Sequence, residues 1–343
     1  MRLRDRVEEL PASTDFRYLS PDVHPAGRTP AREERLMRRG LGLALIGLGV
    51  AFLVLAPMVR WYVVPRVAVA PLDLDPKNTS DSAGTVATVI DLAAGGTESH
   101  DVALLSTRRT KADVVASEQA GGNVGVYDSL STVSLASNPS GTPFLPTDVE
   151  RYAFDRTTSV MVATAGANVG GTPITDAMIG SDTIMPLKMP FFSEKRTYSV
   201  FDSTLMKGAP ADFVGEDTVN GLATYKYEQK IAPVQVGEQA GQPLWYQNDQ
   251  VIWVEPVTGQ IVNGYQQVKQ WLKNADGSDG TVLIDGKIGF TDQEVADSVA
   301  QASANSSKLN FVANILPVLS LVLGVVVLVV GLLLVRRPDG LDG

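Results

Sequence analysis

Two long, uninterrupted apolar segments flank a chain whose remaining apolar and polar residues mostly alternate. Leu41–Val59 and Phe311–Val335 contain no charged residue. A helix rises about 1.5 Å per residue, so either segment is long enough to cross a hydrocarbon core of roughly 30 Å. The pattern therefore predicts two transmembrane helices, over residues 40–59 and 311–335.

Basic residues lie at the outer end of each apolar segment and predict its orientation. Because basic residues are retained on the cytoplasmic side of a membrane, we expect both chain termini in the cytoplasm of a bacterial cell. The first apolar segment begins about forty residues into the chain, which favours an uncleaved signal anchor over a signal peptide. The basic residues are Arg35, Arg38, Arg39, Arg336 and Arg337.

This orientation divides the chain into five parts. Residues 1–39 form a cytoplasmic arm of mixed charge with several prolines, which is typical of disorder. Residues 60–310 form one large extracytoplasmic domain between the two predicted spans, and residues 336–343 form a short cytoplasmic tail. The protein is thus expected in the plasma membrane as a two-pass protein with the lipid bilayer as its first partner.

The extracytoplasmic part has the period-two pattern of β-strands. In Leu222–Lys230, Tyr225 and Tyr227 alternate with charged residues, as in a strand with one covered face. We therefore predict an α+β fold, in which two transmembrane helices flank a large, mainly antiparallel β-rich domain with a few helices. The other predicted strands are Thr85–Leu92, Val102–Thr107, Val124–Tyr127, Ser159–Thr164, Thr197–Phe201, Gln250–Val254, Gln260–Leu272 and Thr281–Phe290.

Local motifs predict the helices and one turn of this domain. The capping boxes Thr147–Glu150 and Thr291–Glu294 each predict a helix start, and the second helix continues toward the membrane. Asn274–Gly280 lies between two predicted strands. Asp276 and Asp279 there suggest calcium ligands, but the spacing of a calcium loop is absent, and a polar hairpin turn is favoured.

Small residues four positions apart occur in both apolar segments. Such pairs allow two membrane helices to approach closely, and we consider packing of the two spans and independent spans as alternatives. The pairs are Gly40 with Ala44, Gly47 with Ala51, and Ser320 with Gly324.

Composition narrows the function. The chain carries a net charge of -9, and residues 61–308 alone hold 17 basic and 29 acidic residues. An acidic exterior argues against binding to nucleic acid. The chain has no cysteine, which excludes disulfides, thiolate metal sites and a cysteine nucleophile and fits a bacterial envelope.

Residues for catalysis are sparse. Of the two histidines, His24 lies in the cytoplasmic arm, and only His100, beside Glu98 and Asp101, is placed for a catalytic triad. No Gly-x-Ser-x-Gly motif accompanies it, and one histidine is too few to propose a zinc site. We predict no enzyme, no cofactor and no metal, with a glycosidase as the remaining enzymatic alternative. Its acids would come from the carboxylate pairs Asp73/Asp75, Asp148/Glu150, Glu216/Asp217 and Asp292/Glu294.

Three groups of motifs, taken together in this order, resemble a known family. They are Phe154–Thr158, then Tyr198–Asp202 with Ala209–Tyr227, and then Val251–Gly259 with Val262–Tyr265. With the two flanking apolar segments, they are similar to the actinobacterial porin PorA-like family over roughly residues 40–335. This resemblance implies a cell-envelope protein. The motifs also have a structural interpretation as strands and turns, in which Asp155 and Arg156 form a buried ion pair.

The overall plan is also similar to that of the class B scavenger receptors, which implies an ectodomain that carries lipid. Our leading hypothesis is therefore an envelope protein that binds or transfers a lipid or another amphipathic envelope component in an apolar cavity. The alternatives are a scaffold or accessory subunit of an envelope assembly or transport complex, with other envelope proteins as partners, and a homo-oligomeric porin-like channel.

Overall fold

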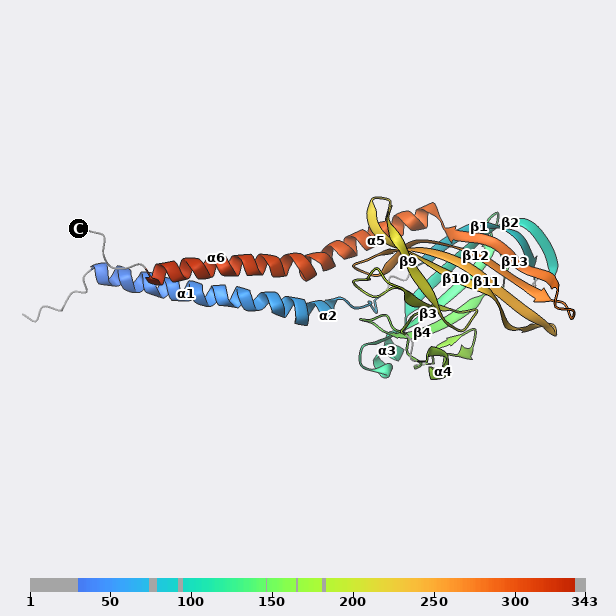
Figure 1. Cartoon of the computed structure of the whole chain (residues 1–343), viewed down its shortest axis with the longest axis horizontal. Coiled ribbons are helices and arrows are strands. Elements are labelled where there is room, and N and C mark those ends of the chain that lie inside the picture. The colour runs from blue at the N-terminus through green and yellow to red at the C-terminus, as the bar shows by residue number, and fades with distance from the viewer. Residues whose placement is uncertain are drawn as a thin grey trace, which may run out of the picture. The chain divides into compact units, whose positions relative to one another are not determined.

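The computed structural model describes residues 30–73, 79–91, 95–145, 147–164, 166–180 and 183–336. Its internal contacts divide the chain into two units (Figure 1). One consists of residues 1–51 and 323–343, of which the described part is entirely helical; the other consists of residues 52–322 and contains the sheet. Most of the predicted cytoplasmic arm, with His24, and nearly all of the predicted tail lie outside the described residues.

Both apolar segments are helical, as their pattern predicts. The stretches Glu33–Val67 and Asp292–Arg336 are long and apolar enough to cross a membrane. The second continues through Asn305–Ser307 without a break, so the predicted helix and the predicted span are one piece. The helical elements are α1 (Pro30–Met58), the π-helical turn η1 (Val59–Val63), α2 (Val64–Val67), α5 (Asp292–Asn310), the π-helical turn η2 (Phe311–Ile315) and α6 (Leu316–Arg336).

In the helical unit, α1 and α6 pack through glycines. A Cβ atom built on Gly49 would lie 2.7 Å from the backbone nitrogen of Leu328, and one built on Gly331 would lie 2.8 Å from the oxygen of Gly42. Close helix packing of this kind requires residues without a side chain. Of the two alternatives, packing of the spans through small residues is therefore the one observed. The glycines predicted in the first span are the wrong ones, whereas Ser320 and Gly324 of the second span are buried. Gly40 and Gly47 have open space around them, because they lie two residues away from the glycines that form the contact.

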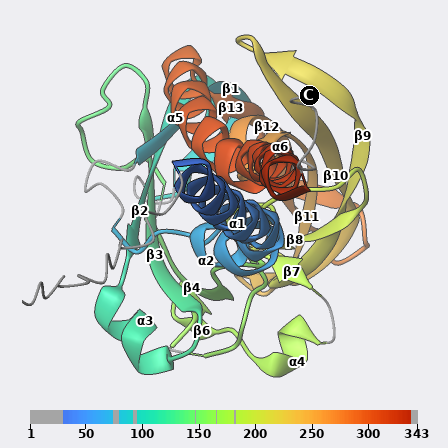
Figure 2. The ribbon, with the colours of Figure 1, turned by 90° about the vertical axis from the view of Figure 1, so that its left-hand side faces the viewer.

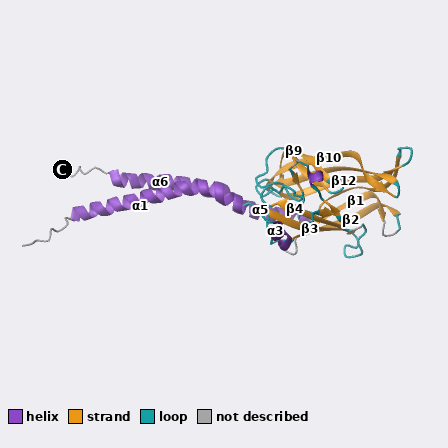
Figure 3. Cartoon of the chain, turned by 90° about the horizontal axis from the view of Figure 1, so that it is seen from below, coloured by secondary structure: helices purple, strands orange, loops and turns teal. Residues whose placement is uncertain are grey.

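The second unit is built on one 13-stranded sheet. Its order is β6-β5-β4-β3-β2-β1-β13-β12-β11-β10-β9-β8-β7, and every neighbouring pair is antiparallel except β7 with β8. The strands are β1 (Thr79–Asp91), β2 (Thr97–Ala112), β3 (Val124–Leu135), β4 (Asp148–Asp155), β5 (Asn168–Val169), β6 (Thr172–Pro173), β7 (Ile184–Met185), β8 (Tyr198–Asp202), β9 (Lys207–Val219), β10 (Leu222–Gln239), β11 (Gln242–Glu255), β12 (Gln260–Lys273) and β13 (Asp279–Phe290). The mainly antiparallel β-rich domain with few helices is thus confirmed (Figure 3).

The sheet curls until its two flanks meet. Figure 2 shows β2–β4 on one side of the curl and β9–β11 on the other. Met161 joins the flanks, since it forms a β-bridge with Phe154 of β4 and donates its backbone N–H to Ile184 O of β7 at 2.8 Å. Closure of this kind gives the sheet an inner face and an outer face.

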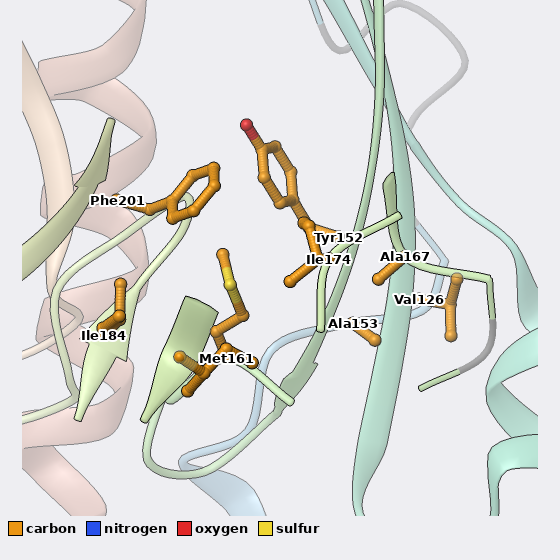
Figure 4. Close-up of a cluster of buried hydrophobic side chains, with 9 residues drawn as sticks. Val126, Tyr152, Ala153, Met161, Ala167, Ile174, Ile184 and Phe201 are labelled. Atoms are coloured by element: carbon orange, nitrogen blue, oxygen red, sulfur yellow. The ribbon is translucent and has the colours of Figure 1, made fainter. Parts of the chain in front are cut away.

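A compact hydrophobic cluster supports this junction (Figure 4). The rings of Tyr152 and Phe201 meet edge to face with their centroids 5.8 Å apart, and the buried side chains of Met161 and Ile184 lie beside them. Tyr152 and Phe201 come from the two flanks of the sheet. Their contact therefore supplements the few hydrogen bonds through which Met161 and Val162 connect β4 with β7.

Two local predictions fail in the region of β4. Ser159–Thr164 was expected to be a strand, but only Met161 forms a bridge. The capping box at Thr147–Glu150 opens strand β4, of which Asp148–Glu150 are the first residues, and no helix begins there. Residues 148–155 pair with β3 over the whole length of β4, and this long-range pairing outweighs a local capping signal.

The other local predictions have mixed outcomes. Thr291 caps α5, since its hydroxyl accepts the N–H of Glu294 at 3.1 Å. The polar turn at Asn274–Gly280 joins β12 to β13, and Asp276 there accepts hydrogen bonds from Ser278. The predicted ion pair of Asp155 with Arg156 is wrong within the described structure. Asp155 accepts the N–H groups of the turn that follows it, and Arg156 donates to Ala70 O at 2.6 Å.

The glycine packing of α1 against α6 yields a test with a matched control. Gly49→Leu places a side chain where Leu328 already lies, and overpacking of this kind costs about 1–3 kcal/mol. Gly47→Leu adds the same side chain in open space and should leave stability nearly unchanged. Thermal unfolding in detergent compares the two variants, and an equal loss in both would contradict packing through Gly49.

Candidate functional site

A cavity of about 180 Å³ lies in the sheet unit, between side chains from both flanks of the curl. Register explains why these residues meet. Gln250 pairs with Gln266 and Asn248 with Val268 across β11 and β12, so alternate residues share the inner face. The polar side chains in its wall are Arg108, Glu150, Lys188, Asp202, Ser203, Gln229, Asn248, Gln250 and Gln266.

The outer face of the same strands is charged. On β10, Tyr227, Gln229 and Ile231 are buried, whereas Lys226, Glu228 and Lys230 alternate with them and are partly or fully exposed. A barrel that crosses a membrane has apolar side chains outside. A charged outer face indicates that this part of the sheet stands in water.

An ion pair links β2 to β4 at the cavity wall. The guanidinium of Arg108 lies 3.3 Å from Oε2 of Glu150 and donates from Nε to the hydroxyl of Ser131 at 3.1 Å. The Glu150 side chain is 4% exposed, but that of Arg108 is 44% exposed. Oε2 of Glu150 makes this ionic contact without a well-aligned hydrogen bond. The cavity wall therefore meets water at Arg108.

Further buried polar groups are fixed across the cavity. The Tyr246 hydroxyl donates to Oδ2 of Asp202 at 2.7 Å, and burial raises the pKa of Asp202. Nε2 of Gln229 donates to the carbonyl oxygens of Val200 and Ala209, each at 3.1 Å. These bonds hold the amide and the acid in place, so the polar wall is preorganised.

One acceptor in the wall has no partner. Asn248 is 3% exposed and its Nδ2 donates to Gln266 at 3.3 Å, while its Oδ1 lacks a hydrogen bond within the described structure. Buried polar atoms normally find a partner, so this oxygen indicates a place for a water or a polar solute. Met185, Met189, Ile252 and Ile261 make another part of the wall apolar.

Lys188 and Ser159, which are 29 residues apart in the chain, form a hydrogen bond that the sequence did not predict. Nζ of Lys188 lies 3.3 Å from the Ser159 hydroxyl and donates to Met189 O at 2.8 Å. Burial lowers the pKa of Lys188 to about 7, an effect that Glu255 partly opposes. A serine beside a neutral lysine can act as an activated nucleophile. Ser159, however, is 0% exposed and is not part of the cavity wall, so a substrate has no access to it.

The residues first considered for chemistry lie elsewhere, with one exception. The imidazole of His100 is 64% exposed and contacts Glu98 and Thr88, not a serine. Within the described residues, no group of three or more His, Asp or Glu side chains is arranged to hold a metal. Asp75 lies outside the described residues; among the described members of the carboxylate pairs, only Glu150 contributes to the cavity.

Most of the cavity wall escaped sequence analysis, although a signal was present. Gln229 shares its strand face with Tyr225 and Tyr227, whose alternation was recognised, and a polar residue on a covered face marks a polar interior. The partners on other strands, such as Arg108 and Asp202, carry no such local signal.

The lowered pKa of the partly buried Lys188 predicts a specific dependence of the free energy of unfolding on pH. Between the folded pKa near 7 and the unfolded value of about 10.4, the unfolded chain binds one more proton, so stability rises with pH by up to about 1.4 kcal/mol per unit. Lys188→Met should abolish this rise between pH 7 and 9, whereas Lys207→Met, at an exposed lysine, should retain it. Denaturant unfolding at several pH values measures both, and equal slopes would refute the assignment.

The ion pair at the cavity predicts a loss of stability when it is broken from one side. Arg108→Met leaves the buried Glu150 without its cation and should cost about 1–3 kcal/mol, reduced by the water that reaches Arg108. Arg109→Met, at the neighbouring exposed arginine, should cost much less. Adding Glu150→Gln to Arg108→Met should restore part of the loss in denaturant unfolding; no recovery would argue against the pair.

Comparison with known proteins assigns the chain to a family. The profile of the family described as Porin PorA matches residues 41–333. A Porin PorA of Corynebacterium resistens is 28% identical over 228 residues, covering 58% of this chain and 54% of that protein. A Porin PorA of Corynebacterium amycolatum is 25% identical over 315 residues, covering 70% of this chain and 80% of that protein. The match thus spans about half the length of the first relative. The family points to a membrane protein of the cell envelope, and the chain belongs to the Porin PorA family.

Proposed function

We propose that the protein is a membrane-anchored, porin-like protein in which the interior of the curled sheet forms a path for small hydrophilic solutes. The observation that carries this proposal is the polar wall inside the closed sheet, which meets water at Arg108. The cavity of about 180 Å³ is smaller than the roughly 300–1,000 Å³ of pockets that enclose a drug-sized ligand, so it suits water and small solutes. The relatives named porins support the same reading.

The topology belongs to this proposal. The two apolar helices cross the plasma membrane, both termini lie in the cytoplasm, and the sheet unit stands on the extracytoplasmic side. The arginines beside each apolar segment support this orientation, and the charged outer face of the sheet supports its location in water. Two helices alone cannot enclose a wide aqueous pore, so conduction across the membrane requires an assembly of several copies.

The lipid-carrier hypothesis and the scaffold hypothesis remain predictions. A lipid cargo requires an apolar tunnel, whereas the cavity is polar over much of its wall and too small for an acyl chain unless it widens. A scaffold role rests on partner proteins. We favour the channel over both because it uses the polar interior, which neither of the others requires.

Planar-bilayer recording of the purified full-length protein tests the channel. We expect reproducible conductance that falls several-fold in Gln250→Leu/Gln266→Leu, because two facing amides of the wall become apolar. Gln235→Leu, at an exposed glutamine of β10, should conduct as the unmodified protein does.

Two results would overturn the proposal. One is no reproducible conductance from the unmodified protein, and the other is equal conductance in the double variant and in Gln235→Leu. Native mass spectrometry of the same preparations separates the remaining hypotheses. A defined lipid retained without conductance would favour the lipid reading, and stoichiometric protein partners would favour the scaffold.

A further inference from the structure

The loop between β7 and β8 presents two adjacent phenylalanines on a rigid support. Three backbone hydrogen bonds fix it to the turn between β11 and β12: Met189 N to Gly259 O at 3.0 Å, Phe192 N to Val257 O at 3.0 Å, and Ser193 N to Pro256 O at 2.7 Å. Nζ of Lys188 lies 3.8 Å from the ring centroid of Phe191. The Phe191–Phe192 pair is therefore held in one position, although both side chains are partly exposed.

The backbone of Phe192 is strained. Its φ is 55°, in the left-handed region that bulky side chains rarely adopt. Such conformations persist only where the surrounding contacts enforce them, and they cluster at functional positions. The hydrogen bonds of the loop supply that enforcement, and as a result two large aromatic side chains are held partly exposed at one edge of the sheet unit.

This edge adjoins the end of the first apolar segment. The guanidinium of Arg60 lies 5.9 Å from the ring centroid of Phe192, and Arg60 directly follows the last residue of the predicted span. Trp61 is 78% and Tyr62 56% exposed, and Arg66 stacks on the Tyr62 ring at 3.6 Å. Exposed tryptophan and tyrosine beside a membrane helix are typical of the headgroup layer. Where the first apolar helix crosses the membrane as proposed above, the phenylalanine pair lies at the level of the membrane surface.

Two of the basic residues here, Arg60 and Arg66, have no carboxylate partner among the described residues. Lys195 pairs with Glu216 and Arg196 with Glu194, but within the described ranges no carboxylate pairs with Arg60 or Arg66. An arginine that binds no carboxylate is available to a phosphate, which it binds well. These two guanidinium groups contrast with the acidic character of residues 61–308, whose net charge is near -12.

We propose that the Phe191–Phe192 pair, together with Arg60 and Arg66, is a membrane-contact surface that rests in the outer headgroup layer and binds anionic lipid phosphates. The rings enter the headgroup layer as an apolar anchor, and the two guanidinium groups take the phosphates. Lipid is favoured over a protein partner because the surface adjoins an apolar helix and carries unpaired positive charge on an acidic domain. The inference goes beyond solute conduction and does not depend on it.

The absence of cysteine makes a direct test available. A nitroxide label on Phe192→Cys in full-length protein, reconstituted in vesicles of phosphatidylcholine with phosphatidylglycerol, reports depth through its accessibility to oxygen and to a water-soluble nickel complex. Ala275→Cys is the control, since it is exposed in the turn at the opposite end of β12, which is 14 residues or about 45 Å away at roughly 3.3 Å per residue.

We expect the label at position 192 to be more accessible to oxygen than to nickel and the label at position 275 to show the reverse. Glu194→Cys, at a side chain that is 72% exposed, is a second label site in the loop if Phe192→Cys fails to fold. An aqueous signal at both loop sites would overturn the proposal.

The role of the arginines has its own measurement. Arg60→Gln/Arg66→Gln, carrying the label at position 192 or 194, should give a shallower signal in vesicles that contain phosphatidylglycerol. In the same variant, the depth of the label should no longer depend on whether the vesicles contain phosphatidylglycerol. A depth that stays the same with and without phosphatidylglycerol, in protein with both arginines intact, would overturn phosphate binding.

Discussion

The pairing of β1 with β13 is the constraint on which the sheet unit depends, because it joins segments about two hundred residues apart. Val86 lies opposite Gly286, and a Cβ on Gly286 would lie 2.5 Å from the Cα of Val86, so only glycine permits this approach. The N–H of Thr291 donates to Asp81 O at 3.0 Å where β13 leads into α5. Without this pairing the sheet would separate into an N-terminal and a C-terminal half, each with an open edge.

The curvature of the sheet allows its flanks to meet at Met161 and creates an enclosed surface. Polar side chains on such a surface are costly unless they are paired, and most here are: Glu150 with Arg108, Asp202 with Tyr246. Within the described wall, Oδ1 of Asn248 has no hydrogen-bond partner, and Oε2 of Glu150 has only its ionic contact with Arg108. An interior whose polar side chains are not all hydrogen-bonded within the protein packs poorly as a hydrophobic core, but it can hold water and small solutes. The proposed function rests on this property.

The short segment that follows α2 is also fastened to the sheet. Ala70 and Arg156 exchange two hydrogen bonds, Ala70 N to Arg156 O at 2.9 Å and Arg156 Nε to Ala70 O at 2.6 Å. The Tyr127 hydroxyl donates to Pro71 O. These contacts hold the base of the sheet unit at a defined place beside Arg60 and Trp61, where the phenylalanine loop reaches the proposed membrane surface.

The sequence by itself determined the features that depend on local pattern: both apolar helices, most strands, the turn at Asn274–Gly280 and the cap at Thr291. Each follows from the residues within one element. Tertiary structure decided whatever needs a distant partner. Pairing with β3 turned the capping box at Thr147 into a strand, and close packing selected Gly49 over Gly47. The cavity was likewise decided only by the fold, because its wall comes from side chains on separate strands that meet when the sheet closes.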